Sequence, residues 1–239
     1  MDVPTTVSTA LEDRPVSGAV CLEAGAGVGN TTAGLLAAGA SHVYAVTNDA
    51  DHAGTVHERV ARDEPDRTAV LEADLRSLPL ADDSVEIITA HGLFNVVSPG
   101  SLDAIVEELR RVAAPGCHLV VDDYEPLPDD AAMRDLFALE NAASELATGG
   151  SALTFYPAAV LRRLFVGEGW QFDRTRTLLD PVPWTEQHVR AHANVARSLA
   201  EDVPGELGEE LSREAERLVT TIGSESIGEM YSIAFRLPD

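Results

Sequence analysis

Lysine is absent from this chain of 239 residues: all 17 basic residues are arginine, against 40 aspartate and glutamate residues, and the formal net charge is −23. An acidic surface binds water and cations and keeps a protein soluble where concentrated salt screens ordinary charge repulsion. The absence of lysine over this length favours an extreme halophile over an acidic mesophilic protein. The same charge argues against DNA or RNA as a partner, because phosphate binding needs basic patches, unless a helper protein supplies one.

Long apolar runs and metal-ligand patterns are also missing. No apolar run approaches the roughly 20 residues that span a bilayer, and residues 1–10 have neither the basic residue nor the apolar core of a secretory signal. We therefore expect a cytoplasmic protein with no membrane span. Cys21 and Cys117 each lie at or beside a predicted strand, as buried thiols would. His188 and His192 are one helical turn apart, but no third ligand is near, so we expect no metal site.

What is present is an alternation of strands and helices from residue 18 onward, which is typical of a parallel α/β sheet. Pro115-Gly116 is expected to turn the chain into the fifth strand, and residues 122–125 to form an acidic turn after it. The last two helices form a hairpin, broken at Pro204-Gly205, before the final strand. The predicted strands are 19–22, 42–46, 68–71, 85–89, 118–121, 170–178 and 231–237, and the predicted helices are 30–38, 50–62, 101–112, 129–146, 157–166, 185–200 and 207–222.

A glycine-rich segment, E-A-G-A-G-V-G at 23–29, follows the first strand and opens the first of these helices. Glycine lets the backbone pass close to a ligand, and the unpaired N–H groups of a helix start can hold a carboxylate. A dinucleotide and S-adenosylmethionine are the competing ligands. The dinucleotide pattern G-x-G-x-x-G, with an acid about 20 positions on, is not met. The third glycine comes one residue early, Asn30 stands in its place, and Thr47 stands where the acid belongs.

The order E-x-G-x-G-x-G instead resembles the first motif of the class I S-adenosylmethionine-dependent methyltransferases. Residues 70–88, VLEADLRSLPLADDSVEII, resemble the segment D-x-x-x-L-P-F-x-D-x-S-F-D of the members that act on quinones and other small molecules. Residues 108–121 resemble their segment E-x-x-R-V-L-K-P-G-G-x-L-V-V. The resemblance covers about residues 18–180 and touches the final strand. It implies a three-layer, doubly wound, mostly parallel seven-stranded sheet with the helical hairpin inserted before the last strand.

The resemblance also implies a site for S-adenosylmethionine. Glu23 would lie near the amino-acid end of this cofactor, Asp74 would accept from the adenine amine unless it only caps a turn, and the Leu75 N–H would meet a ring nitrogen. Thr47, followed by Asn48, departs from the family, which has an acid there that chelates both ribose hydroxyls. Asp49 either replaces that acid or caps the next helix. The remaining expected cofactor residues are Gly25, Ala26, Gly27 and Gly29 under the methionine and ribose, and Ala90 and His91 nearest the methyl group.

Methyl transfer requires no catalytic side chain when the acceptor is a good nucleophile, whereas a hydroxyl acceptor benefits from a base. His91 is the best-placed candidate base or a structural histidine, and Asp123 and Tyr124 are weaker candidates. Two units are expected, residues 1–182 with 223–239 and the hairpin 183–222. The hairpin either covers the acceptor together with 129–146 or forms a homodimer surface. Trp184, Phe137, Phe155 and Tyr156 would line an aromatic pocket or lie in the core.

The function predicted is methyl transfer from S-adenosylmethionine to an unidentified small molecule. A non-catalytic protein of the same fold that binds the cofactor is the alternative, which Thr47 keeps open. A nicotinamide-dependent oxidoreductase is disfavoured by the glycine spacing. Ala90-His91-Gly92-Leu93 stands where nucleic-acid amino-methyltransferases carry N/D-P-P-Y/F, which argues against that class.

Overall fold

The computed structural model describes residues 3–239, so Met1 and Asp2 of the N-terminal stretch considered above lie outside it. One sheet of seven strands in the order β3-β2-β1-β4-β5-β9-β6 forms its centre. All neighbours are parallel except β9, which runs antiparallel to both β5 and β6. The predicted α/β class and mostly parallel seven-stranded sheet are confirmed. The strands are β1 Val20–Ala24, β2 His42–Thr47, β3 Thr68–Glu72, β4 Val85–His91, β5 Ala113–Tyr124, β6 Gln171–Leu179 and β9 Met230–Arg236.

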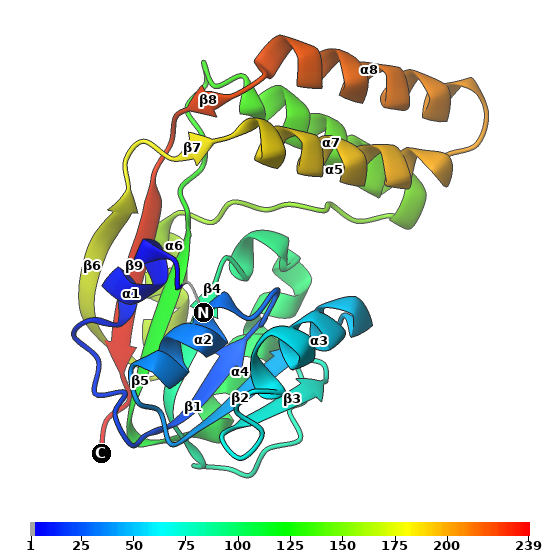
Figure 1. Cartoon of the computed structure of the whole chain (residues 1–239). Coiled ribbons are helices and arrows are strands. Elements are labelled where there is room, and N and C mark those ends of the chain that lie inside the picture. The colour runs from blue at the N-terminus through cyan, green and yellow to red at the C-terminus, as the bar shows by residue number, and fades with distance from the viewer. Residues whose placement is uncertain (1–2) are drawn as a thin grey trace.

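Helices cover both faces of this sheet (Figure 1). Their apolar stripes, such as Ile105, Val106 and Leu109, pack on strands whose side chains are buried on both sides. The two cysteines are buried free thiols, as predicted. On one face lie α1 Thr5–Leu11, α2 Asn30–Ala37 and α3 Ala50–Val56, the last continued by the π-helical η1 His57–Ala61, and on the other lie α4 Leu102–Val112 and α6 Ala158–Gly167.

A separate lobe of three helices stands beyond the carboxyl ends of the strands (Figure 1). Its helices α5 Met133–Thr148, α7 Glu186–Glu201 and α8 Glu206–Ile222 bury a cluster of their own, which includes Trp184 and Leu218. The hairpin α7–α8 lies between β6 and β9, as predicted. The short antiparallel pair β7 Pro183–Trp184 and β8 Glu225–Ser226 ties its two ends together. Among the helices of residues 3–239, none has both the length and the apolar character of a membrane-crossing segment.

Several elements differ from the sequence prediction, three of them substantially. Helix α1 was not predicted, because only seven residues form it and packing of Val7 and Leu11 stabilises it. Helix α5 begins at Met133 rather than residue 129, after a turn. Strand β5 includes Pro115-Gly116, because Ala113 already pairs with Val85 of β4. It also includes the supposed acidic turn at 122–124, because antiparallel pairing with β9 continues to Tyr124.

Candidate active site

The loop between β1 and α2 presents bare backbone to a cleft. Gly27 has φ +50°, a conformation that side chains with a Cβ rarely adopt, and no described atom lies within 4 Å of where its Cβ would be. Gly25 is backed by Leu93, whose Cδ1 would lie 2.8 Å from a Cβ at Gly25. The N–H groups of Gly25 and Ala26 both donate to the carbonyl of Val46. The loop is therefore fixed from behind and open in front.

The start of α2 suits a carboxylate. Gly29 caps this helix without any side-chain hydrogen bond, and no acidic residue occupies its first turn. Arg59 from η1 reaches the loop, where its guanidinium donates to the Val28 carbonyl and to Oδ1 of Asn30. The sequence analysis did not identify Arg59, because no motif relates a helical arginine to a loop some 30 residues earlier. This arginine adds positive charge beside the helix start.

A cavity of about 290 Å³ lies beside the loop, at the carboxyl ends of β2 and β3. Five of the residues predicted to bind the cofactor line this cavity. Its apolar walls come from Leu75, Leu93, Val97 and Ile105. The predicted residues that line it are Gly25, Thr47, Asn48, Asp74 and Leu75.

Thr47 and Asp49 settle one of the open alternatives. The Asp49 carboxylate accepts a hydrogen bond from the His52 N–H at 2.9 Å and caps α3, so the helix-cap alternative is confirmed. Thr47 is 5% exposed, and its hydroxyl oxygen accepts from the Asp49 N–H at 3.2 Å. Within residues 3–239 the hydroxyl hydrogen of Thr47 has no acceptor, which leaves it available to a ligand in the cavity.

Asp74 takes part in a turn and also faces the cavity. Its Oδ1 accepts from the Arg76 N–H at 2.8 Å, which confirms the turn, and its carboxylate pairs with the Arg76 guanidinium, Nε lying 3.0 Å away. These hydrogen bonds from Arg76 lower the pKa of Asp74 to about 2. The carboxylate is therefore a permanent acceptor at neutral pH, and 47% of the side chain remains exposed. Arg76, which the sequence analysis did not single out, also lines the cavity.

A cluster of buried titratable groups lies at the ends of β1, β4 and β5. Nδ1 of His91 lies 3.0 Å from Oδ2 of Asp122, and Glu23 accepts from the Thr32 hydroxyl. Burial raises the pKa of Glu23 to about 7, although the bonds from Thr32 oppose the rise. Burial alone would lower the pKa of His91, but the hydrogen bond to Asp122 and the neighbouring negative charges outweigh it, so this pKa is raised.

Asp123, the next residue on β5, is 1% exposed and belongs to the same cluster. Its two oxygens accept from the backbone and side-chain amides of Asn95, each at 3.0 Å. Burial raises the pKa of Asp123 to about 6 and that of Tyr124 to about 12. Tyr124 is therefore a hydrogen-bond donor rather than a base at neutral pH.

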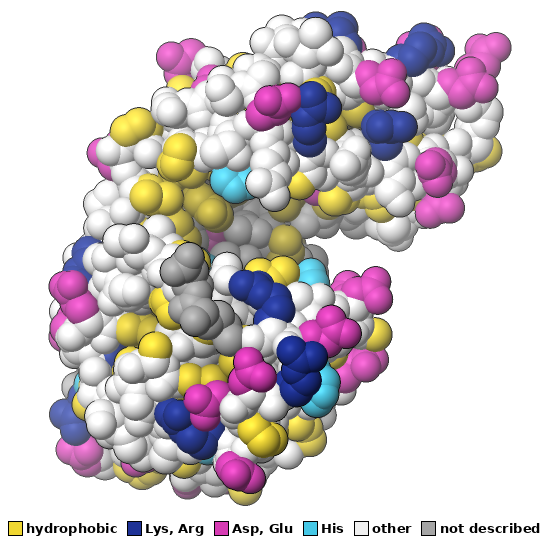
Figure 2. Space-filling view, in the orientation of Figure 1, with side chains coloured by type: hydrophobic (Ala, Val, Ile, Leu, Met, Phe, Trp, Pro, Cys, Tyr) yellow, Lys and Arg dark blue, Asp and Glu magenta, His cyan; other side chains and the backbone are white. Residues whose placement is uncertain are grey.

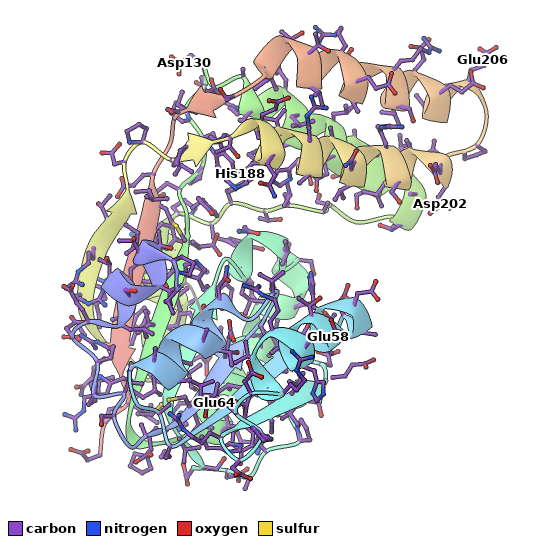
Figure 3. All side chains as sticks on the ribbon, viewed as in Figure 1. Glu58, Glu64, Asp130, His188, Asp202 and Glu206 are labelled. Atoms are coloured by element: carbon purple, nitrogen blue, oxygen red, sulfur yellow. The ribbon has the colours of Figure 1, made fainter. Side chains whose placement is uncertain are left out.

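A second, larger cavity of about 590 Å³ opens on the other side of the segment 92–96, between the sheet and the helical lobe. Figure 2 shows the molecule deeply hollowed between these two parts, with apolar side chains in the hollow. Tyr124, Phe155 and Trp184 line this cavity, and His188, on the side of α7 that faces the sheet, lines it as well (Figure 3). Val96 lines both cavities, and Gly92 and Asn95 line the second one beside it.

The remaining residues that the sequence predicted for the site do not line either cavity. Ala26 packs behind the loop against Ala45, and Ala90 is fully buried in the main core. Phe137 supports the second cavity from behind, with its ring 5.0 Å from that of Phe155. Tyr156 lies in the core and donates to the Val97 carbonyl, so it is not a pocket residue. Glu23, Gly27, Gly29 and His91 line neither cavity.

Comparison with known proteins agrees with this geometry. Residues 21–116 match the protein family described as a methyltransferase domain. A demethylmenaquinone methyltransferase of Clavibacter sepedonicus is 36% identical over 123 residues, which are 51% of this chain and 48% of that enzyme. The chain thus spans about half the length of this relative.

Solved structures agree over nearly the whole chain. The YcgJ protein of Bacillus subtilis superposes with a TM-score of 0.66 at 14% identity and covers 98% of both chains. A methyltransferase of Aquifex aeolicus that depends on S-adenosylmethionine superposes with a TM-score of 0.60 at 15% identity, covering 97% of this chain and 89% of the other. The chain therefore has the fold of the class I S-adenosylmethionine-dependent methyltransferases, and residues 21–116 are similar to a methyltransferase domain.

Proposed function

We propose that this protein transfers a methyl group from S-adenosylmethionine to a small molecule. One observation carries the proposal. An open glycine loop, the polar ends of β2 and β3, and an aromatic cavity lie next to one another at the same edge of the sheet. In open α/β sheets, ligands bind at the carboxyl ends of the strands. The resemblance of residues 21–116 to methyltransferase domains supports the same conclusion.

The residues present fit this cofactor. The bare backbone at Gly27 and the uncapped start of α2 accommodate its amino-acid end, with Arg59 beside them. Thr47 and Asn48 would contact the ribose, where the free hydroxyl hydrogen of Thr47 replaces one of the two bonds that an acid makes. Asp74 would accept from the adenine amine. The Leu75 N–H, which has no partner within residues 3–239, would donate to a ring nitrogen.

When bound, S-adenosylmethionine supplies a methyl group on a positively charged sulfur, which is already activated for displacement. The chain mainly orients the acceptor and excludes water. For a hydroxyl acceptor, we propose His91 as the base, because its ring is paired with Asp122 at the end of the sheet that both cavities share. Asp122 holds the Nδ1–H of its ring, which leaves Nε2 to take the acceptor's proton, and the nearby acids stabilise the charged imidazolium.

The helical lobe, residues 183–222 together with α5, is proposed to cover the acceptor. The larger cavity supports this role, because its walls come both from α5 and α7 and from the sheet end at Tyr124. A homodimer surface is the alternative for the same hairpin. A light-scattering mass equal to one chain would remove that alternative.

We further propose that the protein works in the cytoplasm of a halophile and binds no nucleic acid. The support is the charge of −23 with no lysine. Acidic side chains cover both the helical lobe and the sheet domain on the visible face (Figure 2).

Calorimetric titration with S-adenosylhomocysteine tests the cofactor site. Gly27→Arg should abolish binding, because the new side chain would fill the open space in front of the loop, while thermal unfolding stays cooperative. Gly18→Arg is the matched control: Gly18 also has positive φ, +81°, and open space around its Cβ position, but it lies before β1 at the opposite end of the sheet. Unchanged affinity in Gly27→Arg would remove the proposed site.

A transfer assay with labelled S-adenosylmethionine then separates an enzyme from a binding protein. The enzyme should label at least one compound in a panel of small phenols, amines and carboxylates. Tight binding of the cofactor with no labelled product over the whole panel would favour the non-catalytic alternative. In the calorimetric titration with S-adenosylhomocysteine, Asn48→Ala should weaken binding several-fold.

A further inference from the structure

A histidine and a glutamate form a pair in the helical lobe that the proposed transfer does not use. Glu140 on α5 is 3% exposed within an otherwise apolar cluster. Its Oε2 lies 2.8 Å from Nδ1 of His192 on α7. A buried carboxylate is costly unless it is paired and hydrogen-bonded. The pair therefore holds the His192 ring in one orientation at the wall of the larger cavity, which both residues line.

The partners of two histidines determine where each ring carries its proton. A carboxylate accepts hydrogen bonds, so Nδ1 of His192 carries the hydrogen and Nε2 is left with a lone pair. At His188 the partner is the Thr185 N–H, which donates to Nδ1. Nδ1 of His188 therefore has the lone pair, and Nε2 carries the hydrogen. Nε2 of His192 is therefore a hydrogen-bond acceptor, and Nε2 of His188 is a hydrogen-bond donor.

Both histidines line the same cavity. His188 and His192 are one turn apart on α7 (Figure 3 labels His188). The fold fixes both rings. His188 is held by the capping box at Thr185, and His192 packs edge-on against Phe137 with ring centres 4.8 Å apart.

The rest of the cavity wall is mainly apolar. Trp184 is immobilised by its indole N–H, which donates to the Ile227 carbonyl at 3.1 Å, and its ring contacts that of Tyr124. Leu153, Phe155 and Val195 add further apolar surface. Asn95 is already bonded to Asp123. The cavity thus combines a mainly apolar interior with one acceptor and one donor on the same helix and with the Tyr124 hydroxyl at the sheet end.

We propose that this cavity binds an uncharged, apolar ring compound through one hydroxyl group, with His192 accepting the hydroxyl hydrogen and His188 donating to its oxygen. The inference rests on the proposed function only in treating this cavity as the acceptor's. A hydroxyl is the group that donates and accepts at a single atom, which matches the two nitrogens. His188 and His192 are thereby specificity-determining residues, and Glu140 positions His192.

The tautomers are measured first, on the whole protein at pH 8, by nitrogen-15 NMR of the imidazole side chains. Nδ1 of His192 should carry a hydrogen and its Nε2 none, and Nε2 of His188 should carry a hydrogen and its Nδ1 none. The same tautomer at both residues, or a charged His192, would overturn the proposal, whether or not any probe binds.

Binding is measured by calorimetry with two matched probes, 4-propylphenol and 4-propylanisole. Both oxygens accept a hydrogen bond, but only that of the phenol donates one. The protein should bind the phenol roughly tenfold more tightly, as expected for one additional hydrogen bond to the half-buried His192 ring. His192→Leu should bring the two affinities to within about twofold of one another, whereas His188→Leu should weaken both probes about equally.

Titration of the same variants with S-adenosylhomocysteine is the control for folding and for the cofactor site. The variants should bind S-adenosylhomocysteine with an affinity within about twofold of that of the unaltered protein. Equal affinities for phenol and anisole, a phenol preference that survives His192→Leu, or failure of both probes to bind would each contradict the proposal. Loss of S-adenosylhomocysteine binding in the unaltered protein would instead contradict the proposed function and leave the probe pattern as an independent result.

Discussion

At the scale of single residues, Asp74 supports a turn through Oδ1, pairs with the Arg76 guanidinium through both oxygens and also lines the cavity. Asp74→Asn keeps a carbonyl oxygen for the Arg76 N–H but places an amide N–H₂ toward the cavity, where an adenine amine would also donate. We expect S-adenosylhomocysteine to bind about tenfold more weakly, the effect of one lost charge-assisted bond, with little change in thermal stability. Asp74→Ala should weaken binding similarly and also lower the melting temperature. Unaltered affinity in both variants would exclude Asp74 from the site.

Glu23 should make stability depend on pH. Its pKa is raised from 4.5 to about 7 by burial, so the folded state holds a proton that the unfolded chain releases between these values. The contribution is fully present below pH 4.5 and is lost as the pH rises through 7. Between pH 5 and 8 the loss is about 2 to 3 kcal/mol, since one pKa unit corresponds to about 1.36 kcal/mol.

Denaturant unfolding of the Glu23→Gln variant measures this contribution. The variant should lose less stability between pH 5 and 8 than the unaltered protein by about that amount, because glutamine does not titrate. The raised pKa values of Asp123 and His91 act in the same direction and remain in the variant, so some pH dependence persists. Identical pH profiles for the two proteins would show that Glu23 ionises normally.

The site residues that the sequence could predict share one feature: each lies at or just after the end of a predicted strand. The glycine loop, Thr47 and Asp74 each come directly after a strand, and parallel strands bring those ends to one edge. The partners of these residues were not predictable in the same way. Asp122 meets His91 only through the register of β4 and β5, and the acid-rich sequence 122–125 favours a turn when considered alone. Glu140 and His192 meet only because α5 packs on α7.

At the scale of elements, the amphipathic stripes made α4, α7 and α8 predictable, whereas α1 depends on tertiary contacts. Seven residues are too few for a stable isolated helix. Arg174 on β6 donates to the Ala10 carbonyl at 2.7 Å and to Asp13, and Arg176 donates to the Thr9 carbonyl. Two cations therefore satisfy carbonyls at the carboxyl end of this helix.

Arg174→Leu should release α1 from the sheet. The side chain of Arg174 is 14% exposed, so its loss leaves the Ala10 carbonyl without this donor inside the fold and removes one of the cations paired with Asp13, which keeps Arg14. We expect a loss of about 2 to 3 kcal/mol in the free energy of unfolding and faster proteolysis near residue 10. Arg213→Leu is the control, because the pair of Arg213 with Glu210 is exposed and worth less than about 1 kcal/mol. Equal losses in the two variants would contradict this account of α1.

At the scale of the whole molecule, the net charge of −23 must affect stability through repulsion. Acids also crowd particular places: Glu201 and Asp202 stand at the carboxyl end of α7, where the helix dipole disfavours negative charge (Figure 3 labels Asp202). Salt weakens such repulsion, because the Debye length falls from about 10 Å at 0.1 M to about 3 Å at 1 M. The same fold should therefore be more stable in concentrated salt.

Thermal unfolding in a series of KCl concentrations tests this dependence. Raising KCl from 0.1 to 2 M should raise the melting temperature by roughly 10 °C, which corresponds to a few kcal/mol for a domain of this size. The double variant Glu201→Gln, Asp202→Asn should melt higher than the unaltered protein at 0.1 M and gain less from salt, because it removes repulsion that the salt would otherwise screen. Sucrose at matched osmolality is the control for preferential hydration, which needs no charge. A melting temperature that stays flat or falls with KCl would show that the acidic surface is not adapted to salt and would remove the inference of a halophilic origin.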